Sequence, residues 1–289
     1  MFSLYQFFVS VVLGIVQAVS EWLPVSSKTQ IIIVSTYLLH LTFAQAYAFG
    51  LFMEIGTILA AVIYFRKEVY MLLKTLVGKG TAEGKTLFKF VFVSTLFTGI
   101  IAVPLYIEVA KVSGGYNIGI PMMILGLVLF ADALLIRHSR SKYTVDKNRK
   151  KLSNMSLKEY ALVGIAQGLA ALPGVSRSGA TTSTLLLLNV EADEAFRLSF
   201  IDMILATTAA VFVTLIFSGG SIQTTIADVS VSGLIVSIIV ATVISLFLID
   251  FLLKIAKKSK IVYLIAALGA IALVGGVLIA FFPLGFSAG

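Results

Sequence analysis

The sequence predicts an all-α integral membrane protein, with six transmembrane helices and two re-entrant helical hairpins arranged as an inverted-topology repeat. Three observations predict this fold: the composition, two interrupted apolar stretches, and an uneven distribution of basic residues. The chain has 289 residues, of which 59% are hydrophobic and 12% charged, and its mean hydropathy is +1.04. Such a chain carries too little polar surface to cover a soluble globule of its size.

Several apolar runs have about the 20 residues that are needed to cross the hydrocarbon core of a bilayer. The six predicted crossings are 43–65, 86–109, 117–136, 196–217, 231–253 and 261–284. Two further apolar stretches, 4–40 and 159–190, are each interrupted by a polar sequence that contains proline. These two stretches therefore predict hairpins rather than simple crossings.

Basic residues concentrate in some of the connections between the predicted crossings and avoid the others. The basic connections are 66–89, 137–158 and 254–260, whereas 110–116 and 218–230 contain only Lys111. By the positive-inside rule the basic connections are cytoplasmic. Topology and contact with anionic headgroups thus account for the net charge of +8, and nucleic acid is not an expected partner.

The same rule sets the direction of both hairpins. Stretch 159–190 begins and ends on the cytoplasmic side, whereas 4–40 enters and leaves on the outer side, which puts both termini outside a plasma membrane. No Lys or Arg precedes Lys28, so the N-terminus lacks the basic region of a signal peptide. The absence of cysteine from the sequence excludes disulfides, zinc–thiolate sites and cysteine nucleophiles.

The two interrupted stretches also resemble each other in sequence. The first contains Gly14-Ile-Val-Gln17 and then Leu23-Pro24-Val25-Ser26-Ser27, and the second contains Gly164-Ile-Ala-Gln167 and then Leu172-Pro173-Gly174-Val175-Ser176-Arg177-Ser178. This similarity predicts a single membrane domain over 1–289, with a first repeat at 1–136, a second at 159–289 and a cytoplasmic linker at 137–158. Chance similarity between short apolar segments is the alternative.

The tips of the hairpins are expected to line a cavity, because non-helical backbone is tolerated at membrane depth only where protein or water surrounds it. Each tip offers hydroxyl groups that can cap the following helix. They are Ser26 and Ser27 in the first tip, and Ser176 and Ser178 in the second, with Thr181 one turn further on. Helix N-termini direct N–H groups and a positive dipole end into the cavity, which favours an anion.

Charged side chains inside a bilayer are costly and are by default functional candidates. Arg177 offers a planar fork that matches two phosphate oxygens, with a structural alternative in which it only neutralises Glu21. Gln17 lies four residues before Glu21, on the same face of one helix. Glu54 either lines the cavity or makes a packing hydrogen bond, and these two interpretations stay open.

The motifs resemble the undecaprenyl-diphosphate phosphatase family of the bacitracin-resistance type, together with counterparts that would act on dolichyl-type carriers in archaea. The resemblance is carried by 17–27, which reads QAVSEWLPVSS, by 172–181, which reads LPGVSRSGAT, and by 54–60, which reads EIGTILA. It implies hydrolysis of a polyprenyl diphosphate lipid to the monophosphate, with phosphate released on the outer side. The lipid carrier would then return to the synthesis of cell-surface polymers.

The resemblance also implies roles for individual residues. Glu21 would perform acid/base work or hold a divalent cation, Mg²⁺ or Ca²⁺, while Ser27 would be the nucleophile or a close phosphate contact and Arg177 would bind the diphosphate. A larger set is expected to bind substrate: Gln17, Ser26, Gln30, Glu54, Gly174, Ser176, Ser178 and Thr181. Membrane lipids are the other expected partners, and a homodimer is left open.

The chain also departs from the family pattern. Gln17 stands where bacterial members commonly have Glu, and the family's His after the Ser-Ser pair is Gln30, which cannot carry a proton near pH 7. Asp202 and its neighbours replace an apolar, proline-containing stretch. Two alternatives to a phosphatase therefore stay open. One is a transporter that flips polyprenyl phosphate, because inverted repeats with broken helices are usual in carriers; the other is a weakened lipid-phosphate-binding descendant of the enzyme.

The predicted topology can be tested by labelling, because the sequence contains no cysteine. Single cysteines introduced by Ser141→Cys and Ser221→Cys are expected to react with a membrane-impermeant thiol reagent from opposite faces, the first only after the cells are permeabilised. Labelling of both positions from the same face would contradict the inverted repeat.

Overall fold

The computed structural model describes residues 3–23, 26–111, 119–142, 149–172, 174–256 and 261–282. Within these ranges the chain is helical and contains no strand, apart from one isolated bridge between Lys150 and Val190. The helices are α1 (Leu4–Trp22), α2 (Ser27–Leu39), α3 (Phe43–Tyr64), α4 (Arg66–Leu76), α5 (Ala82–Lys111), α6 (Gly119–Lys142), η1 (Leu152–Asn154), α7 (Leu157–Leu169), α8 (Arg177–Leu187), α9 (Ala192–Val229), α10 (Val231–Ala256) and α11 (Ile261–Phe281). Pro24 and Pro173, at the predicted hairpin tips, and the lysines within 257–260 lie outside the described residues.

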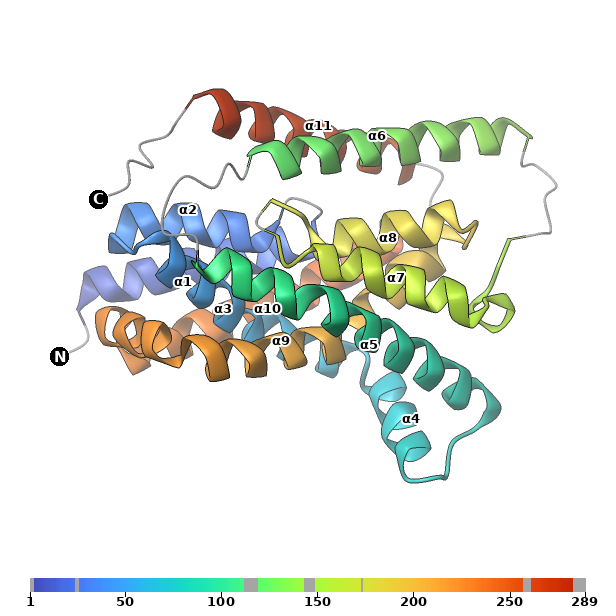
Figure 1. The fold of residues 1–289 in the computed structure, drawn as a ribbon, viewed down its shortest axis with the longest axis horizontal. Helices are drawn as coiled ribbons and strands as arrows, with labels where there is room; N and C mark the ends of the chain where they lie inside the picture. Colours follow the sequence, from blue (N-terminus) through green and yellow to red (C-terminus); the bar gives the residue numbers. More distant parts are fainter. Residues whose placement is uncertain are drawn as a thin grey trace.

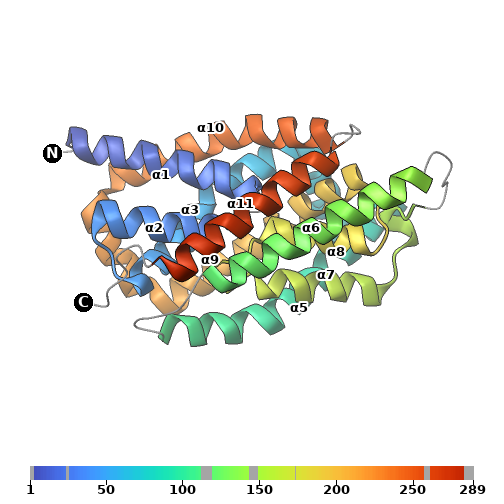
Figure 2. The ribbon, with the colours of Figure 1, turned by 90° about the horizontal axis from the view of Figure 1, so that it is seen from above.

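Most helices lie along one long axis of the molecule (Figure 1). In both ribbon views α1 and α2 occupy one end of this axis, and α7 and α8 occupy the other (Figure 2). Helices α6 and α11 pack against each other across one side of the bundle, and α4 projects from the opposite side together with the start of α5 (Figure 1). The bundle between them contains α3, α5, α9 and α10.

Local sequence signals explain where several helices begin. In a capping box the first side chain accepts from the backbone three residues later, while that residue's side chain accepts from the cap backbone, so two donors are satisfied together. The three boxes are Ser3 with Gln6 before α1, Thr42 with Gln45 before α3, and Ser156 with Glu159 before α7. The local sequence therefore determines where α1, α3 and α7 begin.

Six described helices are long and apolar enough to cross a membrane. These candidate spans are Leu4–Trp22, Gln45–Tyr64, Ala82–Val109, Ala192–Ile216, Val231–Ile255 and Val262–Phe281. The last five coincide with predicted crossings, whereas the first, α1, is predicted as one arm of a hairpin. The predicted crossing 117–136 overlaps α6, in which Met122–Ala131 forms a shorter apolar stretch.

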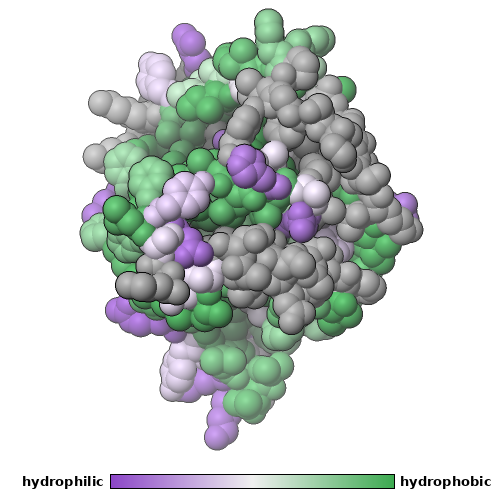
Figure 3. Space-filling view, turned by 90° about the vertical axis from the view of Figure 1, so that its left-hand side faces the viewer, coloured by the Kyte–Doolittle hydropathy of each residue, from purple (hydrophilic) through white to green (hydrophobic). Residues whose placement is uncertain are grey.

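The surface is apolar where these spans are exposed. Large side chains such as Phe92, Phe212, Phe247 and Val274 are more than half exposed, as expected for residues that face lipid chains. Figure 3 looks at the end that carries α1 and α2, where apolar residues cover much of the described surface and hydrophilic residues lie in its middle, at parts of its rim and on the projection below. The chain is therefore a multi-pass membrane protein.

Two predicted connections are more ordered than their sequence suggests. The predicted outer connection 218–230 is helical as far as Val229, because α9 continues past its apolar part. Ser230 alone separates α9 from α10, with φ of 69°, and its hydroxyl accepts from the backbone N–H of Gly233 at 3.2 Å. The basic connection 66–89 contains α4, which the sequence does not predict.

Glycines allow two pairs of helices to approach closely. Gly164 brings α7 against α5, and a Cβ atom at this position would lie 2.2 Å from the backbone oxygen of Ser94. Gly14 brings α1 against α10, where a Cβ atom would lie 2.6 Å from the backbone oxygen of Ser237. Any larger side chain must push these helices apart.

This close approach predicts the effect of Gly164→Ala on stability. The added methyl group meets backbone rather than a movable side chain, so we expect a loss of about 1–3 kcal/mol, measured as a lower thermal unfolding midpoint in detergent. Gly99→Ala in α5 is the matched control, because nothing lies within 4 Å of its Cβ position. Equal midpoints for the two variants would contradict the proposed packing.

Candidate active site

The two polar motifs at the predicted hairpin tips meet in space, although about half the chain separates them. The backbone N–H of Gly174 donates to the Thr29 hydroxyl at 2.8 Å, and the Ser178 hydroxyl donates to the backbone oxygen of Glu21 at 3.1 Å. Gly174 has φ of 93°, in the left-handed region that favours glycine. The turn before α8 thus lies directly against the start of α2 and the end of α1.

Glu21 and Ser27 form a directly hydrogen-bonded pair of reactive side chains. Glu21 lies near the end of α1, and Ser27 is the first residue of α2. The Ser27 hydroxyl donates to Glu21 Oε2 at 2.6 Å, and both residues are buried. Gln17 Nε2 donates to the same oxygen at 3.0 Å and thereby orients the carboxylate. A hydroxyl beside an oriented carboxylate is the arrangement of a nucleophile and its base.

Arg177 connects the motifs through charge. It is the first residue of α8, is 9% exposed, and its Nη2 pairs with Glu21 Oε1. Its Nη1 donates to Glu54 Oε2 in α3 at 3.3 Å and to the Thr207 hydroxyl in α9. The guanidinium of α8 therefore contacts side chains of α1, α3 and α9, so four helices meet at this residue. The contact between Arg177 and Glu21, which the structural alternative requires, is present, and Glu54 is a second partner.

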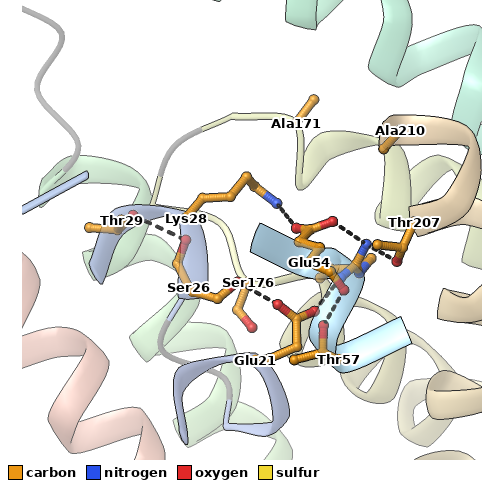
Figure 4. Close-up of polar contacts among 12 residues, drawn as sticks. Glu21, Ser26, Lys28, Thr29, Glu54, Thr57, Ala171, Ser176, Thr207 and Ala210 are labelled. Atoms are coloured by element: carbon orange, nitrogen blue, oxygen red, sulfur yellow. Dashed lines mark hydrogen bonds and ion pairs between the residues drawn. The ribbon is translucent and has the colours of Figure 1, made fainter. Parts of the chain in front are cut away.

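Lys28 adds a second cation, which the sequence-based reasoning missed. Figure 4 shows its side chain running from the start of α2 toward Glu54, where its Nζ lies 3.7 Å from Glu54 Oε1. Two carboxylates, Glu21 and Glu54, therefore face two cations, Arg177 and Lys28. The group is neutral as a whole, which is how buried charges become tolerable in a medium of low dielectric constant.

A cavity of about 90 Å³ opens beside this charged group. Among the described residues that line it, the charged ones are Lys28 and Arg177. Most of the remaining wall is small or apolar and comes from α3, α5, the end of α7, and α9: Leu51, Gly99, Ala102, Val103, Ala170, Ala171, Ala206, Ala209, Ala210 and Val213. The cavity thus has two cations in a mainly apolar wall.

The other predicted site residues surround this group in different ways. Ser176 caps α8 as predicted, since its hydroxyl accepts from the backbone N–H of Gly179 at 3.2 Å. The prediction that Ser26 caps α2 is wrong: its φ is 58°, its side chain accepts from no backbone N–H of the helix, and its hydroxyl instead accepts from the Thr29 hydroxyl at 3.0 Å. Ser27, also predicted as a cap, is held by Glu21 inside the first turn.

Among the described lining residues, Arg177 is the one predicted site residue, and the contacts of two others show where they lie instead. The Thr181 hydroxyl is fully buried and bonds to the backbone oxygen of Arg177 at 2.9 Å and to the Ser199 hydroxyl, so it packs α8 on α9. Gln30 lies one turn into α2, half-buried, and is not among the residues that line the cavity.

A second buried polar cluster mirrors the first. Gln167 Nε2 donates to Asp202 Oδ2 at 3.0 Å, as Gln17 Nε2 donates to Glu21 at 3.0 Å in the first motif. The Ser94 hydroxyl donates to the same Asp202 oxygen at 2.6 Å. Asp202 therefore has a packing role between α5, α7 and α9, beside the cavity that Gln167 lines.

The residues present do not form a cage for a divalent cation. Both Glu21 oxygens are already engaged, Oε1 by Arg177 and Oε2 by Ser27 and Gln17. In the described ranges no group of three or more His, Cys, Asp or Glu side chains lies together. A hard cation prefers several oxygen ligands, so Mg²⁺ or Ca²⁺ would need oxygens from a bound phosphate group. The expected cofactor stays a prediction.

Two contributors to this site escaped the sequence reasoning, for different reasons. Lys28 carried a usable signal, because an ammonium directly after the Ser-Ser pair and inside an apolar stretch is costly and thus a functional candidate. Thr207 carried none, since hydroxyl residues are common in membrane helices and only the fold brings this one to Arg177.

The chain is similar to known proteins over nearly its whole length. Residues 10–274 match the family model described as "Bacitracin resistance protein BacA". The chain is 50% identical over 271 residues to a protein of Saccharolobus solfataricus, covering 93% of this chain and 95% of that one. It is 45% identical to one of Sulfurisphaera tokodaii (93% and 96% covered) and 39% identical to one of Pyrobaculum aerophilum (93% and 97% covered). Each relative is named undecaprenyl-diphosphatase.

The charged group predicts a large stability cost for Arg177→Met. The change leaves Glu21 and Glu54 buried without their shared partner, so we expect a loss of about 3–5 kcal/mol, measured by thermal unfolding in detergent. Adding Glu54→Gln to this variant removes one of the two stranded charges and is expected to recover part of the loss.

Arg197→Met is the matched control, since Arg197 pairs with Glu68 at 2.8 Å but its side chain is 34% exposed. Its loss is expected to stay below about 1 kcal/mol, as for surface ion pairs. Equal losses for Arg177→Met and Arg197→Met would count against Arg177 as the centre of the buried group.

Proposed function

Because the chain belongs to the bacitracin resistance protein BacA family, we propose that it hydrolyses undecaprenyl diphosphate, or another polyprenyl diphosphate, to the monophosphate and phosphate. The single observation that carries this proposal is the Ser27 hydroxyl, which donates to Glu21 at 2.6 Å beside the Arg177 guanidinium. Nucleophile, base and phosphate-binding fork thus lie within one buried group.

The reaction follows from these positions in two displacements. Ser27 Oγ attacks the terminal phosphorus while its proton passes to Glu21 Oε2, and the bond from phosphorus to the bridging oxygen breaks. The bridging oxygen keeps the electron pair, leaves as part of the polyprenyl monophosphate, and receives the proton from Glu21. Water then attacks the phosphoserine, giving a proton to Glu21, which returns it to Ser27 Oγ as phosphate leaves.

The remaining residues bind and orient in this scheme. Arg177 neutralises charge that develops on the phosphoryl oxygens, which is the larger part of catalysis in phosphoryl transfer. The backbone N–H groups at the start of α2 and α8 favour an anion at the same place. Ser26, Ser176, Ser178 and Gly174 shape the turns that hold these N-termini, and Gln17 and Glu54 hold Glu21 and Arg177 in place.

The architecture proposed for this site is an inverted repeat with two re-entrant hairpins. Helix α1 packs on α10 as α7 packs on α5, and Gly14 and Gly164 occupy matching contacts against Ser237 and Ser94. The hairpins approach from opposite ends of the long axis (Figure 2). The basic connections favour a plasma membrane orientation with both termini outside and a site open to the outer side, where recycled carrier serves cell-surface polymer synthesis.

Transport of polyprenyl phosphate is the other function that such a repeat supports, but the pairing of Ser27 with Glu21 favours hydrolysis over passage. The homodimer stays a prediction. The same holds for Mg²⁺ or Ca²⁺, which we expect to act through the diphosphate oxygens rather than through a protein cage, and which chelation during the assay will test.

Replacement of Glu21 tests the mechanism. Glu21→Gln keeps the shape and the hydrogen-bonding reach of the side chain but removes the base, so we expect phosphate release from a polyprenyl diphosphate in detergent to fall about 100-fold or more. Binding of the lipid should change much less. Glu83→Gln, at an exposed position near the start of α5, is the control and should keep full activity.

A variant at Gln30, where the family commonly has His, can contradict the proposed hydrolysis. Gln30→His restores the commoner family residue, and its activity near pH 7 should equal or exceed that of the wild type. If the wild type and Glu21→Gln are equally inactive while Gln30→His alone releases phosphate, the chain is a binding or transport descendant, and the proposed hydrolysis is wrong.

A further inference from the structure

We infer that Lys28 is a second cationic ligand of the substrate diphosphate, held ready by Glu54 until the substrate arrives. Lys28 is the second residue of α2, directly after Ser27, and is only 5% exposed. Lysine is rarely buried without a close partner. The distance of 3.7 Å from its Nζ to Glu54 Oε1 exceeds that of a direct hydrogen bond. An ammonium with three donors is therefore only loosely held.

The partner of Lys28 is also incompletely satisfied. Glu54 Oε1 is buried and, in the described part of the chain, has no hydrogen-bond partner, whereas Glu54 Oε2 accepts from Arg177 at 3.3 Å. The Glu54 carboxylate can thus remain with Arg177 when Lys28 moves. Separation of Lys28 from Glu54 costs less than separation of Arg177 from Glu21, which share a direct hydrogen bond.

The cavity shows what Lys28 can approach instead. In the described lining the charged groups are Lys28 and Arg177, both positive, while Glu21 and Glu54 lie behind them. Figure 4 shows the Lys28 side chain between the first turn of α2 and Glu54. Ala171 and Ala210 lie above these two side chains in the view. Two cations in the wall of a mainly apolar cavity match a lipid head that carries two phosphates.

The charge of the diphosphate favours binding by two cations of the site rather than by one. The resting group is neutral, because Glu21 and Glu54 balance Arg177 and Lys28. A diphosphate brings at least two negative charges, and Arg177 is already committed to Glu21, Glu54 and Thr207. Lys28 supplies a positive charge that can turn from Glu54 to a phosphate oxygen without leaving the cavity. It thereby supplies charge that a divalent cation would otherwise carry.

The role of Lys28 rests on the proposed substrate, so binding is measured apart from turnover. Inorganic pyrophosphate, which has the diphosphate but no lipid, is the probe, and its affinity for the full-length protein in detergent is measured by calorimetry. Lys28→Met is expected to weaken binding about 10- to 100-fold, as for loss of a hydrogen bond between charged groups. Lys28→Arg should retain much of the affinity, and Lys158→Met, at an exposed position, should retain all of it.

The double variant Lys28→Met/Glu54→Gln tests whether Lys28 binds the pyrophosphate or only neutralises Glu54. It restores the charge balance without restoring the ammonium, so we expect pyrophosphate binding to remain weak. Recovery of wild-type affinity would overturn the inference, since Lys28 would then only neutralise Glu54. Equal affinity of Lys28→Met and wild type, or no binding by the wild type, would overturn it as well.

Turnover measurements distinguish two negative results: that Lys28 does not bind the diphosphate, and that the protein does not hydrolyse it. Phosphate release from a polyprenyl diphosphate should show a KM raised about 10-fold or more in Lys28→Met, and added Mg²⁺ should restore more activity to this variant than to the wild type. A wild type that binds pyrophosphate through Lys28 but releases no phosphate contradicts hydrolysis and supports Lys28 as an anion ligand. Normal turnover kinetics in Lys28→Met contradict the role of Lys28 and leave hydrolysis standing.

Discussion

The buried guanidinium of Arg177 between Glu21 and Glu54 is the interaction on which the rest of the structure depends. A charge at this depth is tolerable only when opposite charge and hydrogen bonds surround it, and the partners come from different helices. The start of α8, the end of α1 and the middle of α3 must therefore meet at one place. The cavity, the proposed nucleophile and the second cation all take their positions from this meeting point.

Helix packing makes the meeting point possible. Gly14 and Gly164 let α1 approach α10 and α7 approach α5 closely enough for backbone contact, so the ends of the two short helical pairs reach the interior. Gly174 then turns the chain against Thr29, and the first turns of α2 and α8 come to face the same cavity. Small residues and backbone geometry thus support a site whose chemistry lies in a few polar side chains.

Much of this could be read from the sequence. Buried acids, a buried Arg and hydroxyls within interrupted apolar stretches predicted that Glu21, Ser27 and Arg177 would come together, because such groups are stable only near one another. The sequence could not show that Ser26 has a positive φ and leaves α2 uncapped, since that depends on how the turn is closed. Nor could it show that Thr207 reaches Arg177, or that α9 continues to Val229, because both follow from packing between distant helices.

The balance of two acids and two cations has an electrical consequence. The voltage across an energised membrane exerts no net force on an empty site without net charge, whereas it does act on a phosphate anion formed there. In a site that opens outward, as we propose, an interior-negative voltage drives that anion out. The full voltage acts with about 2.3 kcal/mol per unit charge for each 100 mV, and a charge that starts part-way across experiences a corresponding fraction. Under this proposal, product release in a living cell would be electrogenic, and faster than the same step in detergent.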